Sequence, residues 1–361
     1  MEFGLTPEQV ALADTVRRYL ADQCPTDRVR AIMESDSGHD VDLWRGLMEL
    51  GVGALPVPEQ HGGMAAELLD LALVSEELGF ACAPGPFLGC ALATVALAAG
   101  DDEEAKARWL PAIAAGETLA TVAIGESGSR WDAHELQARA GNGRLSASKP
   151  LVPYASLSRL HVVAATDGGE AALFLVESDA AGVEMTALSG NDRTRRLEVV
   201  EYRDVQARRI GGTAAFERVR DAALVLIAAD AFGGARRCLE MARTYALQRE
   251  QFGQVIGAFQ AVKHQLANLA VDLEPGLSLW WYAAHSLDAL PEQAPRHAAM
   301  AKAHLCDLFD RAARDSTELH GGIGFTWEFD LHLWLRRSLF DRSFFGDSHY
   351  HRARAARLAG W

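Results

Sequence analysis

Residues 245–260 read YALQREQFGQVIGAFQ, and this stretch decides how the whole chain is interpreted. It places Arg249, Phe252, Gly253 and Gln260 near one end of a helical pattern. An arginine beside a glycine-containing turn is a good ligand for a diphosphate, because the guanidinium supplies paired donors and glycine lets the backbone approach. Phe252 can cover an adenine or a ribose, and the amide of Gln260 offers both a donor and an acceptor.

A plainer interpretation of the same residues stays open. Phe252, Ile256 and Phe259 would then be ordinary core side chains, and Arg249 would be a solvated surface charge. Apolar residues at helical spacing are the usual mark of a buried helix face. The stretch by itself does not choose between the two interpretations.

Around this stretch the chain divides into three regimes of hydrophobic pattern. Residues 5–116 have a helical period that begins at the capping signal TPEQ (6–9). Residues 117–208 carry short runs rich in Val, Leu and Thr between turn signals, which is typical of a small all-β domain. From about residue 214 the helical period returns.

We therefore predict an α+β chain of three domains. They are an N-terminal helical domain (1–116), a middle β-barrel or sandwich domain (117–208) and a C-terminal four-helix bundle (209–361). The clearest expected strands are 118–124, 160–165, 172–176 and 197–202. Pro275 and the stretch 291–295 are expected to break the C-terminal helices, because proline lacks the backbone donor.

Composition excludes several classes of partner. The 361 residues include 35 Lys plus Arg against 49 Asp plus Glu, a net charge of -14, which argues against general nucleic-acid or anionic-membrane binding. Five scattered cysteines without a CxxC pair predict neither a disulfide framework nor a zinc site. The N-terminus does not resemble a signal peptide, and no long uncharged apolar stretch occurs, so we expect a cytoplasmic protein.

Motifs of other enzyme classes are missing from the sequence. There is no GxSxG elbow, no GxGxxG after a strand, no GxxxxGK[ST] and no HExxH. His349 and His351 are two residues apart, and on a helix this spacing points them to different faces. We therefore predict no metal site.

Several phrases, in order, resemble the FAD-dependent acyl-CoA dehydrogenase family. They are FGLTPEQVALADTVRRYL (3–20), LWRGLMELGVGALPVPEQHGG (43–63), LVSEELG (73–79), WLPAIAAGE (109–117), the stretch 245–260 and ELHGGIGF (318–325). The resemblance covers essentially the whole chain. The Ala- and Arg-rich composition is similar to that of actinobacterial members, some of which are subunits of heteromeric enzymes.

The resemblance implies cofactor, substrate and partners. FAD of a neighbouring subunit would be bound by residues matching the family's ligands, namely Arg249, Phe252, Gln260, Glu318, Gly322 and His349. Relatives often have Gln where Glu318 stands. Asp221 matches a position that meets the pantetheine of an acyl-CoA substrate. An electron-transfer flavoprotein-type acceptor and an oligomer, either a homo-oligomer or a heteromer with a second such subunit, are implied as partners.

The resemblance fails at the catalytic base. The family reaction needs a carboxylate to take a proton from the carbon next to the thioester, and the usual Glu position is occupied here by Phe345. A minority of relatives carry the Glu on the helix before the 245–260 stretch. The equivalent position is Ala223, and the Arg that often follows is Leu224. Both base positions are therefore empty.

The flavin-binding loop departs as well. The family's Thr-Glu-Pro-Gly-Ala-Gly-Ser-Asp reads GESGSRWD (125–132), and its Trp-Ile-Thr phrase reads Leu151-Val152-Pro153. Proline removes a backbone donor that could bind the flavin ring. The seat of the isoalloxazine ring is thus less well preserved than the diphosphate seat.

Two carboxylates can substitute for the missing base. Asp230 lies in the apolar run 224–232, where a lone carboxylate needs a partner or a raised pKa, and Asp347 lies two residues past Phe345. Each also has a structural interpretation. Asp230 can make a buried helix-to-helix hydrogen bond, and Asp347 can be the N-cap of a terminal helix at 349–358.

Four functional hypotheses follow. The first is an FAD-dependent acyl-CoA dehydrogenase of fatty-acid or sterol side-chain β-oxidation in which this chain is a subunit without its own Glu, helping a partner. The second is a homo-oligomer with Asp230 as relocated base. The third is a non-catalytic scaffold, and the fourth is a flavin monooxygenase or nitroalkane-type oxidase on the same fold.

Overall fold

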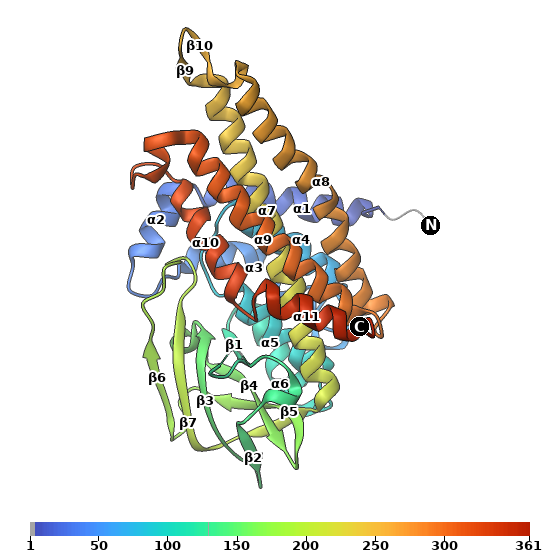
Figure 1. Cartoon of the computed structure of the whole chain (residues 1–361). Helices are drawn as coiled ribbons and strands as arrows, with labels where there is room; N and C mark the ends of the chain where they lie inside the picture. Colours follow the sequence, from blue (N-terminus) through green and yellow to red (C-terminus); the bar gives the residue numbers. More distant parts are fainter. Residues whose placement is uncertain (1–3, 129) are drawn as a thin grey trace.

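The computed structural model describes residues 4–128 and 130–361, which form a helical, a β and a second helical part in chain order (Figure 1). The N-terminal part consists of α1 (Pro7–Gln23), α2 (Thr26–Glu34), α3 (Val41–Glu49), η1 (Val52–Ala54), η2 (Glu59–His61), α4 (Leu68–Phe80), α5 (Phe87–Ala99) and α6 (Glu103–Ala114). The predicted start of α1 is confirmed: the Thr6 side chain accepts from the Gln9 amide, and the Gln9 side chain accepts from the Thr6 amide.

The middle part is one mixed sheet of eight strands. Its strands are β1 (Ala120–Ala123), β2 (Arg139–Gly141), β3 (Arg144–Pro153), β4 (Leu160–Asp167), β5 (Glu170–Glu177), β6 (Val183–Ala187), β7 (Leu197–Gln206) and β8 (Arg208–Gly211). The order is β6-β7-β3-β2-β4-β5-β8, with β1 parallel to β4. Two short 3-10 turns, η3 (Ala133–Glu135) and η4 (Ala155–Leu157), lie in its loops.

The alternation of side chains along β4 shows how this sheet is buried on both faces. Val162 and Ala164 belong to the main core shared with the helices. Val163 and Ala165 point the other way, into a second core formed by the sheet itself. The four strands expected from sequence are present. β2, β3, β6 and β8 were not among them, and in β6 three of the five residues are exposed, so it carries little buried apolar signal.

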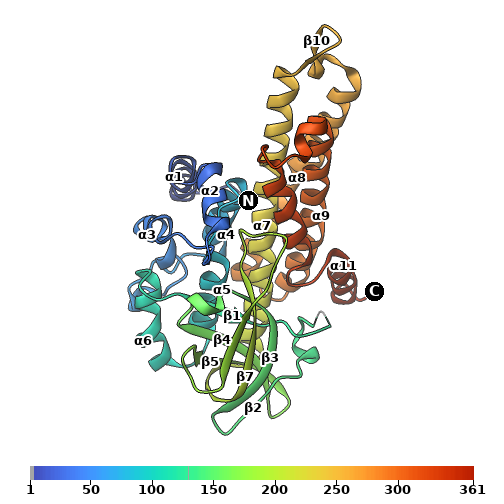
Figure 2. The ribbon, with the colours of Figure 1, turned by 90° about the vertical axis from the view of Figure 1, so that its left-hand side faces the viewer.

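The C-terminal part is a bundle of long helices that projects beyond the other parts (Figures 1 and 2). It comprises α7 (Thr213–Gln248), β9 (Glu250–Gln251), β10 (Gln254–Val255), η5 (Ile256–Ala258), α8 (Gln260–Ala289), α9 (Ala294–His320), η6 (Gly321–Phe325), α10 (Leu331–Ser343) and α11 (Ser348–Leu358). The predicted C-terminal helical bundle is confirmed, and it is built from three long and two short helices. Among the described residues no helix is long and apolar enough to cross a membrane.

The expected break at Pro275 is wrong. This proline lies inside α8, which runs unbroken from Gln260 to Ala289. Its ring leaves the carbonyl of Val271 without a helical donor, and Val271 lies on an exposed face where water can replace it. The predicted break at 291–295 is confirmed, because α8 ends at Ala289 and α9 begins at Ala294.

A buried ion network holds the three parts together. Asp230 of α7 accepts a hydrogen bond at 2.8 Å from Arg195, which lies in the loop before β7. Arg337 of α10 donates to both Asp230 oxygens at 3.2 Å. Arg337 also donates to Asp192 of the same loop at 2.8 Å. Both guanidinium groups donate to the carbonyl of Ala83, just after α4. Every part of the chain thus contributes to one network.

Two buried carboxyl groups near this network have pKa values that shift in opposite directions. Burial and the neighbouring Asp230 carboxylate raise the pKa of Asp341 well above its usual value. Burial alone would also raise the pKa of Asp230, but Arg337 and Arg195 outweigh it and lower that pKa. Asp230 and Asp192 are the carboxyl groups that accept from the two guanidinium groups of Arg195 and Arg337.

We predict that Arg337→Met lowers the free energy of unfolding by about 3–5 kcal/mol, because it leaves buried carboxylates uncompensated. Arg342→Met on the same helix is the matched control. Its side chain is 44% exposed and paired with Asp307 at 3.0 Å, so a loss of about 1 kcal/mol or less is expected. Urea unfolding of both variants checks the difference, and equal losses would contradict the role given to the network.

Candidate functional site

The sequence stretch that dominated the analysis folds into a hairpin at the projecting end of α7 and α8 (Figure 1). α7 ends at Gln248, and β9 pairs with β10 through the register Gln251↔Gln254. Phe252 and Gly253 form the two-residue turn with φ values of 54° and 81°. Both angles are positive, as a type I′ turn requires, so the helical stripe expected through Phe252 is interrupted here.

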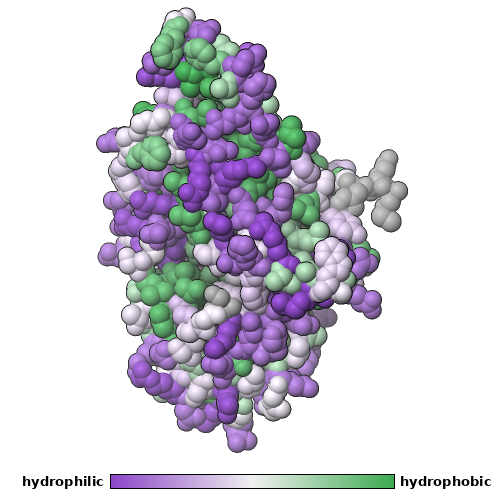
Figure 3. All heavy atoms as spheres, in the orientation of Figure 1, coloured by the Kyte–Doolittle hydropathy of each residue, from purple (hydrophilic) through white to green (hydrophobic). Residues whose placement is uncertain are grey.

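The hairpin exposes the predicted ligand residues. Phe252 is 94% exposed, which excludes its interpretation as a core residue, and Ile256 and Phe259 are only half-buried. Arg249 and Gln260 are exposed at the ends of α7 and α8, and Figure 3 shows polar and apolar surface mixed at this end of the molecule. A cation, an aromatic ring and an amide thus lie together on an open surface.

The second motif, near residue 320, lies where α9 passes into η6. Glu318 and Gly322 are exposed, and a side chain added at Gly322 would meet open space. His320 is buried beneath them and stacks on Tyr245 with ring centroids 4.4 Å apart. This contact joins the end of α9 to α7, and so links the two sequence motifs. His349 is exposed on α11, away from the hairpin (Figure 1).

The position of the missing base is filled by an aromatic stack. Phe345 is 1% exposed and lies on the indole of Trp131, with ring centroids 4.8 Å apart and planes at 25°. Phe344 meets the same indole edge-on at 5.8 Å. The alternative base position, Ala223, is completely buried among apolar residues, as is Leu224.

The two departures from the family pattern therefore touch each other. Trp131 comes from the 125–132 loop and Phe345 from the loop of the usual base, and in the family these loops lie at the flavin. Gly125 leaves room for the indole, since a Cβ there would lie 2.4 Å from the Trp131 ring. Sequence analysis treated the two changes as separate losses because residues 214 positions apart give no sign of contact.

Asp221 lies inside a buried ion cluster that it shares with Asp132, Arg220 and Arg354. Arg354 donates to Asp221 at 2.9 Å, and Arg220 donates to Asp132 at 2.9 Å and to Asp221 at 3.0 Å. Burial would raise the pKa of Asp132, but Arg220 and Arg354 outweigh it and lower that pKa. Sequence analysis did not identify either arginine as a partner of Asp221. The only local signal is the stretch ERVRD (217–221), which places Arg220 next to Asp221.

The two substitute bases have structural partners. Both oxygens of Asp230 are engaged by guanidinium groups, as described above. Asp347 is exposed and its carboxylate accepts the Tyr350 amide at 2.8 Å as the N-cap of α11, which confirms the capping interpretation. The structure gives neither residue a place beside a substrate, and their role as a base stays a prediction.

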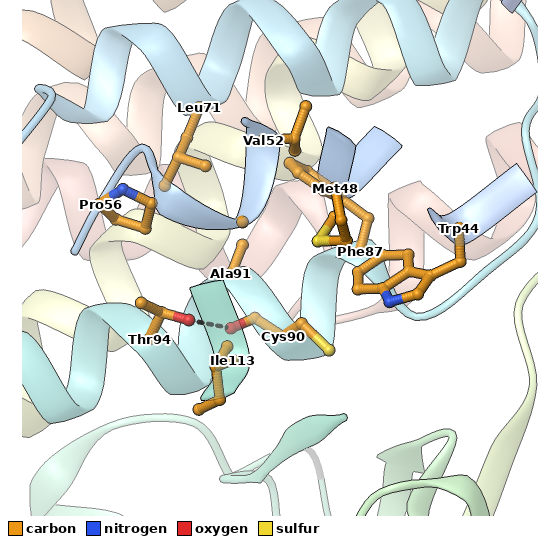
Figure 4. A pocket seen from close by; sticks show the side chains of 11 residues that line it. Trp44, Met48, Val52, Pro56, Leu71, Phe87, Cys90, Ala91, Thr94 and Ile113 are labelled. Atoms are coloured by element: carbon orange, nitrogen blue, oxygen red, sulfur yellow. Dashed lines mark hydrogen bonds between the residues drawn. The ribbon is translucent and has the colours of Figure 1, made fainter. Parts of the chain in front are cut away.

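A small apolar cavity in the N-terminal part is too small for a thioester. It encloses about 20 Å³ and is lined by side chains of α3, α4, α5 and α6 and of the turn that follows α3 (Figure 4). Its one hydroxyl, Thr94, already donates to the carbonyl of Cys90 at 2.8 Å. A volume of this size holds about one water molecule.

Within residues 4–128 and 130–361 no cluster of His, Cys, Asp and Glu could hold a metal ion.

Comparison with known proteins gives the family. Residues 6–117 match the acyl-CoA dehydrogenase, N-terminal domain, and residues 202–359 match the acyl-CoA dehydrogenase, C-terminal domain. Acyl-CoA dehydrogenase IpdE2 of Mycobacterium tuberculosis (strain ATCC 25618 / H37Rv) is 33% identical over 337 residues, covering 92% of this chain and 92% of that relative. The chain belongs to the acyl-CoA dehydrogenase family. It thus belongs to the flavoprotein oxidoreductases of the β-oxidation type, a family whose cofactor is FAD.

Two solved structures share this fold closely. The ChsE4-ChsE5 complex from Mycobacterium tuberculosis is similar with a TM-score of 0.92 and 27% identity, covering 100% of this chain and 99% of that chain. The Tcur3481-Tcur3483 steroid ACAD, in its G363A variant, has a TM-score of 0.92 and 29% identity, covering 98% of both chains.

The residues present fit FAD unevenly. The exposed guanidinium of Arg249, the ring of Phe252 and the open backbone at Gly322 suit a diphosphate and an adenine presented from outside the chain. At the flavin loop, by contrast, the indole of Trp131 and the ring of Phe345 pack on each other. The chain's own ring seat therefore does not fit an isoalloxazine.

We expect acid to destabilise the loop at Phe345 through His351. His351 Nε2 donates to the Phe345 carbonyl at 2.8 Å, and burial, with Lys302 adding to it, lowers the pKa of His351 to about 3 from 6.5. His351 is therefore protonated at a higher pH in the unfolded state than in the folded state. The contribution of neutral His351 to the free energy of unfolding is complete above pH 6.5 and is lost as the pH falls toward 3, by about 2 kcal/mol between pH 6.5 and 5.

The check is the melting temperature between pH 7 and 5 for His351→Gln, which cannot take up the proton. Its melting temperature should fall less than that of the wild type over this range. His349→Gln, an exposed neighbour on α11, serves as control and should follow the wild type. Parallel curves for all three proteins would contradict the assignment.

Proposed function

We propose that this chain is the subunit without a base in a heteromeric, FAD-dependent acyl-CoA dehydrogenase, where it completes the FAD site of a partner subunit. The observation that carries the proposal is the contrast between two surfaces. The chain's own base position is closed by the Trp131–Phe345 stack. Its partner-facing ligands, Arg249, Phe252 and Gln260, are exposed and together.

In this arrangement the chain's own residues bind and orient. Bound FAD supplies the hydride acceptor for α,β-dehydrogenation of an acyl-CoA thioester. Arg249 would bind the FAD diphosphate with charge-assisted hydrogen bonds, and Phe252 would cover the adenine or the ribose. Gln260 and the open backbone at Gly322 would contact the same end of the dinucleotide. The proton would leave the substrate on a carboxylate of the partner.

The partner and the substrate class are part of the proposal. The solved ChsE4-ChsE5 complex and a steroid ACAD, both similar over nearly the whole chain, support a heteromer and a fatty-acid or sterol side-chain thioester. An electron-transfer flavoprotein-type acceptor would take the electrons, and the site would work in the cytoplasm. Glu318 faces solvent beside Gly322, so its charge can point away from a diphosphate.

The test is FAD affinity of the complex co-purified with its partner subunit. Arg249→Gln should raise the FAD dissociation constant by about 10- to 100-fold, because a charge-assisted contact is worth about 1.5–3 kcal/mol. Arg243→Gln, also an exposed arginine near the end of α7, is the control and should leave the constant unchanged. Equal FAD affinity in both variants would sink the proposal.

A relocated base at Asp230 is the alternative within the same family. Since Asp230 is bound by Arg195 and Arg337, we expect Asp230→Asn to lower the melting temperature of the complex while its flavin still bleaches with an acyl-CoA. Bleaching is read as loss of visible flavin absorbance. A variant that keeps FAD and its melting temperature but no longer bleaches would establish Asp230 as the base.

A further inference from the structure

The packing around residues 131–135 carries an inference about the chain's own flavin seat. We propose that the Trp131–Phe345 stack and the ion cluster of Asp132, Arg220, Asp221 and Arg354 replace a bound flavin, locking the middle domain onto α7 and α11, so that this seat neither takes FAD nor needs it. The inference rests on the proposed function in one respect, namely that the FAD is bound in the partner subunit's seat.

The aromatic half of this lock joins two domains through rings. Trp131 of the middle domain is 3% exposed and lies against Phe344 and Phe345 of the C-terminal domain. Phe345 adopts a left-handed backbone with φ of 60°, a conformation that a bulky residue rarely takes. Such strain persists only where the surroundings fix it, and here the stack on the indole does so.

The ionic half fixes the next residue of the same segment. The carboxylate of Asp132 accepts from Arg220 of α7 at 2.9 Å and lies 3.5 Å from Arg354 of α11. Asp221 accepts from both arginines, so each of the two carboxylates pairs with Arg220 and with Arg354. The exposed Arg357 of α11 adds a third cation, 3.7 Å from Asp132, at the solvent side of these four residues. All four residues are buried. Buried ion pairs of this kind tolerate little displacement, because a group that lost its partner would be an unpaired charge shielded from water.

Glu135 binds the backbone of the same segment and links it to α11. Its carboxylate accepts the backbone amides of Trp131 at 2.9 Å and of Asp132 at 3.0 Å, and it also accepts the hydroxyl of Tyr350 on α11 at 3.1 Å. The backbone amides of Trp131 and Asp132 are thus used within the chain. A ligand at this place would have to break these hydrogen bonds as well as displace the rings.

Together these contacts explain why the two departures from the family pattern occur in one chain. A tryptophan alone in the loop would collide with a bound flavin, and a phenylalanine alone at the base position would leave an apolar ring beside a polar seat. As a pair, each ring supplies the buried apolar surface that the other needs. The seat is occupied by the protein itself.

The test is hydrogen exchange on the full-length chain, followed by mass spectrometry with and without added FAD. Amides of residues 131–135 and 344–351 should be protected to the same extent in both conditions. Trp131→Ala should speed their exchange by about tenfold or more, because it removes the stack that fixes both segments. The variant should also retain more added FAD in equilibrium dialysis than the wild type does.

Trp44→Ala is the matched control, since Trp44 is similarly buried but lies in the N-terminal domain. It should lower the melting temperature without speeding exchange at residues 131–135. The proposal is overturned if FAD increases protection of these residues in the wild type, or if Trp131→Ala leaves them as protected as Trp44→Ala does. Should either variant fail to fold alone, the wild-type comparison with and without FAD still decides. None of these results touches the effect of Arg249→Gln on the partner's FAD, so the two proposals fail separately.

Discussion

A carboxylate buried between two guanidinium groups fixes how the three domains of this chain meet. Asp230 holds Arg195 and Arg337, and through them the middle-domain loop, α10 and the end of the first helical domain. Burying these charges is costly, so the network tolerates only the geometry in which every partner is satisfied. The relative placement of the 125–132 loop and the loop at Phe345 follows from this constraint.

That constraint produces two surfaces with opposite character. Between the middle and C-terminal domains, the flavin seat that we propose to be closed holds the stacked rings of Trp131 and Phe345. At the far end of α7 and α8, Arg249 and Phe252 are exposed on a hairpin that projects from the bundle. This pair of features is what we expect of the proposed subunit, which contributes contacts to the FAD of a neighbour.

The sequence allowed the architecture and the two motif surfaces to be predicted, because capping signals, apolar periodicity and motif spacing are local. It did not reveal that Phe252 turns out of the helix, since a hairpin of six residues between helices leaves the apolar period intact. The pairing of Trp131 with Phe345 and of Asp221 with Arg354 also escaped prediction. Those contacts join distant segments, and only the folded chain brings them together.

The most direct test of the account is the flavin content of the full-length chain purified alone and with its partner, measured together with bleaching by an acyl-CoA. The account predicts that the chain alone carries almost no FAD and shows no bleaching, whereas the complex carries FAD and bleaches. One FAD per chain in the protein purified alone, reduced on addition of an acyl-CoA, would contradict it.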